Sequence, residues 1–119
     1  MTRRVVYYAH AIALYHSTEE MEMTSVITKE LGHLDIINPK YIPGNGTMQP
    51  YFNTIDLCDV VVFSRYKGKV MAGVGAEINY ALSKSKAVYE LRNGKLRIVR
   101  HPVSYLGRDE TRRLYWEGN

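Results

Sequence analysis

Short apolar runs alternate along the chain with longer segments in which apolar residues recur at helical spacing. The apolar runs, rich in valine, isoleucine and tyrosine, predict strands at residues 5–9, 35–37, 59–64, 87–91 and 96–99. The intervening segments predict helices from a cap at Ser17 to about residue 31, and at 50–57, 78–83 and 109–116. The run at 59–64 is apolar almost throughout, which is typical of a strand buried on both faces of a parallel sheet.

Local signals mark several of these boundaries. Ser17 and Glu20 form a capping-box pattern, and Gly32 is placed to end the same helix. Asn93 and Gly94 are a hairpin signal, so the last strand is expected to run antiparallel to the one before it. From the helical spacing we expect the following side chains to face the core: Met21, Val26, Ile27, Leu31, Phe52, Ile55 and Leu57.

This order of elements predicts an α/β fold with one doubly wound, mostly parallel sheet of the Rossmann or flavodoxin-like type and an antiparallel edge strand. The 119 residues fit a single domain covering 1–119. Ligands of such sheets bind at the carboxyl ends of the strands. That edge is expected to carry Tyr8, His10, Asn38, Ser64 and Arg65.

Composition narrows the class of protein. The single cysteine excludes an internal disulfide, and the first apolar run is too short and too polar for a signal peptide or a membrane span. We therefore expect a cytoplasmic protein with no membrane partner. The formal net charge of +4 suits anionic ligands but is too small to argue nucleic-acid binding. A nucleic-acid-binding protein would use exposed tyrosines together with four arginines, namely Arg3, Arg4, Arg112 and Arg113.

Glu77 is the main candidate for chemistry. It follows Gly73 and Gly75, which we place in a turn before the helix, so that Glu77 lies in the first helical turn. Glycines there let a ligand approach the backbone, and Arg65 with two lysines in the preceding loop adds charge for a phosphate. A carboxylate in this place can attack an anomeric carbon. It can equally be a favourable charge near a helix start, beside a tight turn and a solvated basic loop.

Other polar side chains near the strand ends could complete a site. Tyr7 or Tyr8 could orient Glu77 through a hydroxyl group, and His10 could act as an acid or a base near neutral pH. Candidates to hydrogen-bond a base or a sugar are Asn38, Asp56 and Ser64, although solvated loop side chains would give the same pattern. The histidines show no metal-ligand spacing, so we expect neither a metal nor another cofactor.

Four segments resemble the nucleoside 2-deoxyribosyltransferase superfamily, nearest its branch of deoxynucleoside 5′-monophosphate N-glycosidases. They are residues 6–9, 59–62, 73–81 and 86–89, and the similarity extends from about residue 5 to 91. The resemblance implies that Glu77 attacks the anomeric carbon and that Tyr7 orients it. It also implies that Gly73 and Gly75 hold the 5′-phosphate or 5′-hydroxyl end, and that the protein is a homodimer.

The chain departs from the family pattern in three places. Met71 stands where the family has a serine or aspartate that holds the sugar, and His10 replaces a small residue after the first strand. The loop before the glycines is long and basic, and Asp56 is the nearest candidate for a sugar-binding aspartate. We expect an N-glycosidase or deoxyribosyltransferase acting on a nucleotide or nucleoside. The alternative, which Met71 favours, is a non-catalytic nucleotide-binding or sensing module of the same fold.

Overall fold

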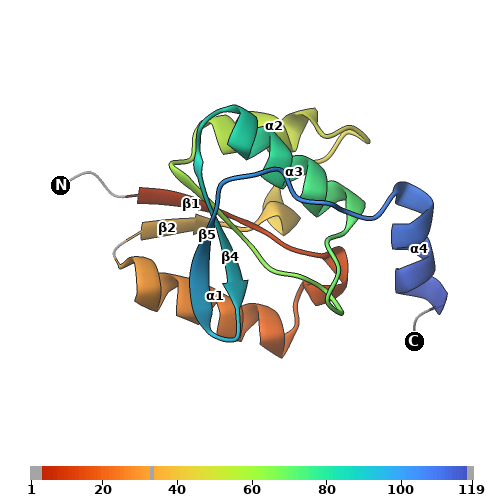
Figure 1. Ribbon diagram of the computed structural model, residues 1–119, viewed down its shortest axis with the longest axis horizontal. Helices are drawn as coiled ribbons and strands as arrows, with labels where there is room; N and C mark the ends of the chain where they lie inside the picture. The colour runs from red at the N-terminus through yellow and green to blue at the C-terminus, as the bar shows by residue number, and fades with distance from the viewer. Residues whose placement is uncertain (1–3, 33, 118–119) are drawn as a thin grey trace.

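The structure is a computed structural model that describes residues 4–32 and 34–117, so Arg3 of the basic set above lies outside the described residues. Its strands, α-helices and short 3₁₀ helices follow in the order β1 (Arg4–Ala9), η1 (Ile12–Leu14), α1 (Thr18–Leu31), β2 (Leu34–Ile37), η2 (Pro39–Tyr41), α2 (Gln49–Asp56), β3 (Val60–Phe63), α3 (Ala72–Ser83), β4 (Ala87–Arg92), β5 (Lys95–Val99) and α4 (Arg108–Glu117). The strands form one sheet in the order β2-β1-β3-β4-β5 (Figure 1).

The sheet is parallel except at one edge. β1 pairs in parallel with both β2 and β3, and β3 pairs in parallel with β4, whereas β5 runs antiparallel to β4. Helix α1 covers one face of the sheet, and α2 and α3 cover the other (Figure 1). This strand order is that of flavodoxin-like folds. The predicted fold class, with its antiparallel edge strand, is confirmed.

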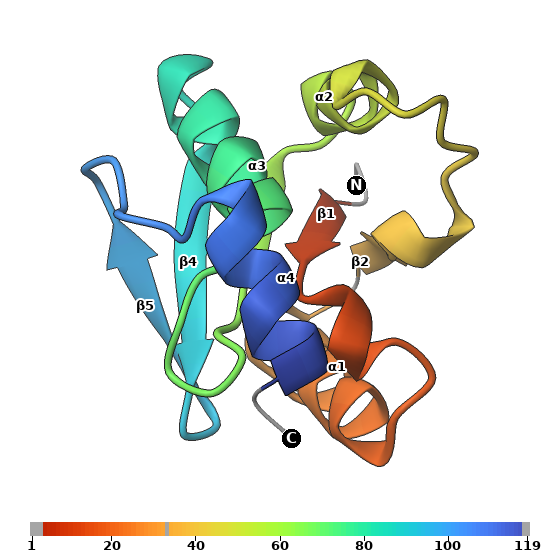
Figure 2. The same ribbon diagram turned by 90° about the vertical axis from the view of Figure 1, so that its right-hand side faces the viewer.

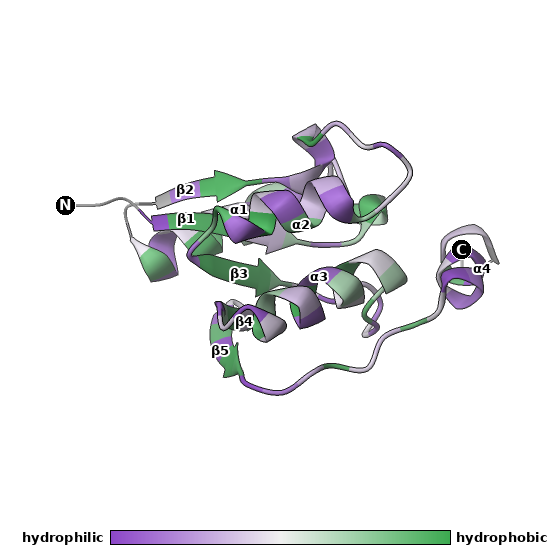
Figure 3. Ribbon diagram, turned by 90° about the horizontal axis from the view of Figure 1, so that it is seen from above, coloured by the Kyte–Doolittle hydropathy of each residue, from purple (hydrophilic) through white to green (hydrophobic). Residues whose placement is uncertain are grey.

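Alternate residues of each strand point to opposite faces of the sheet, and this divides the core in two. Tyr7 packs with Ile78 on the side of α2 and α3, whereas Tyr8 packs with Ile27 on the side of α1. Strand β3 is buried at every position and is hydrophobic along its length in Figure 3. It is therefore the strand buried on both faces that its continuous apolar run predicts.

Helix α1 begins and ends where the local signals place it. Ser17 Oγ accepts a hydrogen bond from the Glu20 backbone N–H at 3.0 Å, and Gly32 follows the last helical residue with a φ of 80°. Two of the predicted inward side chains are wrong, since Met21 is 72% exposed and Leu57 is 80% exposed. At this end of α1 the buried position belongs to Glu20, and Leu57 lies beyond the last residue of α2.

The predicted glycine turn before α3 is wrong. The helix begins at Ala72, so Gly73 and Gly75 lie in its first turn and Glu77 lies in its second. Packing explains why the glycines are compatible with a helix here. A Cβ atom on Gly75 would lie 2.1 Å from the Tyr105 ring, so this position must be a glycine for the C-terminal segment to cross α3.

The C-terminal segment crosses α3 and ends in α4, which lies across the carboxyl edge of the sheet (Figure 2). The side-chain oxygen of Asn79 accepts the Val103 backbone N–H at 3.0 Å, and the Leu106 backbone N–H donates to the Val70 carbonyl at 2.9 Å. The helix predicted at residues 109–116 thus lies at the edge where parallel α/β sheets bind their ligands. Within the described ranges, no helix combines the length and apolar character needed to span a membrane.

Candidate functional site

A cavity of about 180 Å³ opens at the carboxyl edge of the sheet, beneath α4. Its walls come from the segment after β1, from η2, from the start of α2, from the first two turns of α3 and from α4. It is lined by His10, Ala11, Ile12, Tyr15, Pro39, Met48, Tyr51, Met71, Gly73, Val74, Glu77, Thr111 and Tyr115. This is the edge at which parallel α/β sheets bind their ligands.

Glu77 places a buried carboxyl group in the wall of this cavity. The residue is 5% exposed, and it accepts a hydrogen bond from the Tyr7 hydroxyl group. Burial raises the pKa of Glu77 to about 8, although the hydrogen bond from Tyr7 opposes the shift. Burial and the neighbouring Glu77 raise the pKa of Tyr7 far above its ordinary value, so the phenol remains a donor. At neutral pH the Glu77 carboxyl is therefore mostly protonated, and it ionises as the pH rises through 8.

The first turn of α3 brings backbone groups beside the cavity. Met71 precedes the helix without a side-chain cap, and the Ala72 backbone N–H donates to Thr111 Oγ1 at 3.0 Å. Gly73 lines the cavity, and a Cβ atom there would meet no atom within 4 Å. Gly75 faces the C-terminal segment instead. Of the two glycines, Gly73 is the one placed to let a ligand approach the backbone.

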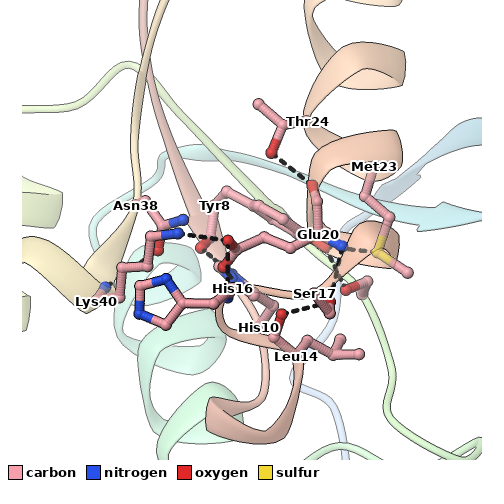
Figure 4. Close-up of polar contacts among 11 residues, drawn as sticks. Tyr8, His10, Leu14, His16, Ser17, Glu20, Met23, Thr24, Asn38 and Lys40 are labelled. Carbon is pink, nitrogen blue, oxygen red and sulfur yellow. Dashed lines mark hydrogen bonds and ion pairs between the residues drawn. The ribbon is translucent and has the colours of Figure 1, made fainter.

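At the end of β1, the buried side chains of His10 and Glu20 form a polar cluster with the half-buried Lys40 (Figure 4). His10 Nδ1 lies 2.8 Å from the Tyr8 carbonyl oxygen, and Nε2 lies 2.6 Å from Glu20 Oε2. Glu20 Oε1 accepts hydrogen bonds from Lys40 Nζ at 2.5 Å and from the His16 backbone N–H at 3.2 Å. Burial by itself raises the pKa of Glu20, but the hydrogen bonds from Lys40, His10 and other donors lower it to about 2. Glu20 is thus a buried, ionised carboxylate at neutral pH.

The two tyrosines of β1 belong to different surroundings. Tyr7 reaches Glu77 on the side of α3. Tyr8 faces α1, where its hydroxyl oxygen lies 2.8 Å from Ser64 Oγ and 2.7 Å from Met23 Sδ. Tyr8 and Ser64 therefore contact each other on the opposite face of the sheet from Glu77, and neither lines the cavity.

The remaining predicted residues do not line the cavity. Arg65 Nε donates to Glu90 at 2.9 Å, and Asp56 accepts a hydrogen bond from the Tyr80 hydroxyl at 2.7 Å. Asn38 accepts a backbone N–H from η2 at 3.1 Å. No lysine or arginine of the described ranges lines the cavity. A 5′-phosphate bound here would meet backbone N–H groups and no free cationic side chain.

Sequence analysis missed part of the lining, namely Tyr15, Tyr51, Thr111 and Tyr115, and it missed the partner of His10. These lining residues come from separate segments of the chain. The only sequence signal for them was the high number of tyrosines, ten in 119 residues. Glu20 matched a helix-capping pattern, which concealed that its side chain reaches His10. In the part of the chain that the structure describes, no group of three or more metal-ligating side chains occurs.

The chain matches no family model and no curated protein. A solved structure similar to it is the crystal structure of a conserved protein from Enterococcus faecalis V583, with a TM-score of 0.58 and 18% sequence identity. The match covers 75% of this chain and 63% of that one, so the chain corresponds to less than two thirds of that protein's length. At this identity the similarity shows the α/β fold alone.

Proposed function

We propose that this chain is an N-glycosidase or deoxyribosyltransferase acting on a nucleoside or nucleotide, with Glu77 as its nucleophile. The observation that carries the proposal is the hydrogen bond from Tyr7 to the buried Glu77 carboxyl in the wall of a cavity. The pair joins β1 to α3 across 70 residues of sequence, at the edge where ligands of this fold bind. The resemblance to nucleoside 2-deoxyribosyltransferases assigns the same two residues.

In the proposed reaction, an oxygen of ionised Glu77 attacks C1 of the sugar and forms a glycosyl ester. The C1–N bond breaks, and its electron pair leaves with the base, which takes a proton from water. Water or a second base then attacks C1 and gives up a proton to solvent, while the ester C1–O bond breaks and its electron pair returns to the Glu77 carboxylate. Tyr7 holds the carboxyl in one orientation throughout, because its hydroxyl is buried and donates to the carboxyl oxygen.

The size of the cavity restricts how a substrate could bind. Its volume of about 180 Å³ is below the roughly 300–1,000 Å³ typical of small-molecule sites. A cavity of this volume would hold a sugar or a base alone, so the remainder of a nucleoside would extend outside it. The rings of Tyr15, Tyr51 and Tyr115 offer aromatic surfaces for a base.

The test compares wild type with Glu77→Gln and Glu77→Ala on a panel of nucleosides and nucleoside 5′-monophosphates, with free base measured by liquid chromatography. Wild type should release base, and both variants should lose more than about a hundredfold of that activity. Glu30→Gln, on the exposed face of α1, is the matched control and should retain full activity. Equal, slow release by wild type and Glu77→Ala would remove the catalytic proposal.

The second candidate is a non-catalytic nucleotide-binding or sensing module. Two features favour it: apolar Met71 lines the cavity, and burial raises the pKa of Glu77 to about 8, which favours the protonated carboxyl at neutral pH. Titration calorimetry with the same panel separates the candidates. Binding without base release, unchanged in Glu77→Gln, would select the sensing module.

The resemblance also leads us to propose a homodimer, and the single cysteine leads us to propose that it is cytoplasmic. Ile12 and Trp116 are exposed apolar side chains on segments at the carboxyl edge, where they are available for contacts between subunits. Size-exclusion chromatography with light scattering measures the mass in solution. A mass of 13.7 kDa, that of one chain, would contradict the dimer.

A further inference from the structure

His10 has both ring nitrogens engaged by protein acceptors. Nδ1 lies 2.8 Å from the Tyr8 carbonyl oxygen, which can only accept, so Nδ1 carries a hydrogen. Nε2 lies 2.6 Å from Glu20 Oε2. His10 is 2% exposed, so solvent does not offer an alternative partner for either nitrogen. The charge of the ring therefore depends on whether the hydrogen between these two atoms is bonded to His10 Nε2 or to Glu20 Oε2.

The surroundings of Glu20 assign that hydrogen to His10. The other carboxylate oxygen receives the Lys40 ammonium at 2.5 Å and the His16 backbone N–H at 3.2 Å, and both of these groups are donors. A carboxyl group held by donors alone is stabilised in its ionised form, and an ionised carboxylate can only accept. This arrangement of donors favours a hydrogen on Nε2 of His10 in addition to the one on Nδ1.

The groups around the imidazole suit a cation. The Tyr8 ring stacks on it with centroids 4.0 Å apart and an interplanar angle of 12°, and the Tyr15 ring meets it edge-on at 5.1 Å. Burial raises the pKa of both phenols, that of Tyr8 to about 12, so they remain neutral near neutral pH. The charged groups of the cluster are Glu20 from α1 and, beyond it, Lys40 from η2.

We infer that His10 is a fixed imidazolium in the wall of the cavity, held by Glu20, and that it stabilises negative charge in the cavity without exchanging a proton. His10 and Glu77 line the same cavity, and neither N–H group of His10 is free to face a ligand. The catalytic part of this inference rests on the proposed function. The charge of His10 would favour the electron pair that leaves with the base. The base takes its proton from water, because His10 keeps both of its own.

Glu20 is the positioning residue in this arrangement, since it acts on the cavity only through His10. Glu20→Gln keeps the size of the side chain but removes the negative charge that holds the second hydrogen on the imidazole. In that variant we expect His10 to lose a proton between about pH 5 and 8, the usual range for histidine. The matched control is Glu19→Gln, an equal change of charge at the exposed neighbouring residue in the first turn of α1.

The first test is ¹⁵N NMR of the histidine side chains in the full chain from pH 5.5 to 8.5. The His10 signals are identified by their loss in His10→Gln. In wild type and in Glu19→Gln, both nitrogens should appear protonated throughout this range, whereas in Glu20→Gln they should titrate. A neutral His10 in wild type at pH 7 overturns the inference, whether or not the chain is an enzyme.

The second test is the pH dependence of kcat/KM for base release. The ratio of Glu20→Gln to wild type should be near one at pH 5.5, where His10 is charged in both proteins, and about tenfold lower at pH 8.5. A ratio lowered equally at every pH indicates a merely structural role and overturns the positioning role. If wild type releases no base from any substrate, the proposed function fails, and the NMR result still determines the charge of His10.

Discussion

Glu20 and Glu77 are buried carboxyl groups at the same edge of the sheet, and their pKa values move in opposite directions. The pKa of Glu20 falls to about 2, because Lys40, His10 and a backbone N–H donate to it and outweigh the effect of burial. The pKa of Glu77 rises to about 8, because burial is opposed only by the hydrogen bond from Tyr7. At the residue scale, the number of donors around each carboxyl decides whether it is ionised.

This difference predicts how stability depends on pH. The folded-state pKa of Glu77, about 8, lies above the ordinary value of 4.5, so ionisation of Glu77 opposes folding. Its contribution to stability is complete below pH 4.5 and is lost as the pH rises through 8. Glu77→Gln removes this titration and keeps an oxygen acceptor for Tyr7. The Tm difference between Glu77→Gln and wild type, measured by calorimetry, should therefore be more favourable to the variant at pH 9 than at pH 5, by about 5 °C or more.

The control for this prediction is Glu30→Gln, because Glu30 is exposed on α1. Its Tm difference from wild type should be the same at pH 5 and pH 9. If the difference for Glu77→Gln is also independent of pH, Glu77 ionises in the folded protein at its ordinary pKa.

At the scale of elements, α3 shows packing overriding a local signal. Two glycines in a first turn lower helix propensity, yet the helix begins at Ala72 and continues through both of them. Tyr105 occupies the space that a side chain at Gly75 would need, and Gly73 has no neighbour within 4 Å of its missing Cβ. The two glycines are therefore present in the same helical turn for different reasons.

Alanine substitution at each glycine should show which of them is required by packing. Gly75→Ala places a Cβ atom 2.1 Å from Tyr105 and should lower the free energy of unfolding by about 1–3 kcal/mol. Gly73→Ala meets no atom and should leave that free energy unchanged, or raise it by up to about 1 kcal/mol through helix propensity. Urea denaturation measures both. The added Cβ atom would also lie 2.4 Å from the Tyr105 Cβ, so the matching second change is Tyr105→Gly, which removes both the ring and that Cβ. Gly75→Ala should cost much less in the Tyr105→Gly background than in wild type, and an equal cost in both would show that Tyr105 is not its cause.

The start of α1 offers a second test on a single element. Ser17 Oγ accepts the Glu20 N–H at 3.0 Å, so Ser17→Ala should lower the free energy of unfolding by about 1 kcal/mol. Ser25→Ala changes the same residue type at an exposed position in the middle of α1. It should have no such cost in the same denaturation experiment, because alanine favours the helix interior. Equal losses at both positions would contradict a capping role for Ser17.

At the scale of the whole molecule, α4 stands apart from the layers formed by the sheet and its covering helices. It closes one side of the cavity through Thr111 and Tyr115. Its contacts with the rest of the fold include the hydrogen bond from Ala72 N–H to Thr111 Oγ1 and the edge-on contact of the Tyr66 and Tyr115 rings. This wall of the site thus depends on an element that is largely polar (Figure 3).

We expect α4 to be locally less stable than the central strands of the sheet. Amides in α4 are expected to exchange with solvent at least about a hundredfold faster than those of β1 and β3, because few buried apolar contacts protect them. Hydrogen exchange followed by mass spectrometry measures this directly. Thr111→Val, which removes the oxygen that Ala72 N–H contacts, should increase exchange in α4 and leave β3 unchanged. Equal protection of α4 and β3 would show that α4 unfolds only with the whole domain.

Much of the architecture follows from neighbours within a few residues. The valine-rich run of β3, the Ser17 cap and the Asn93–Gly94 turn each act locally, and each appears where the pattern predicts it. The exposure of Met21 could not be predicted in the same way. A polar residue, Glu20, is buried beside it because His10 and Lys40 satisfy its charge, and these partners lie elsewhere in the sequence.

The sequence by itself determined the α/β order, the antiparallel edge strand, and Glu77 and Tyr7 as candidate reagents. Only the tertiary structure decided that Tyr7 and not Tyr8 meets Glu77, that Arg65 is already paired with Glu90, and that α4 closes the cavity. Periodicity and turn residues act over a few positions, so a sequence displays them. The charge and availability of a polar group depend on its burial and on partners distant in sequence, and these exist only after folding.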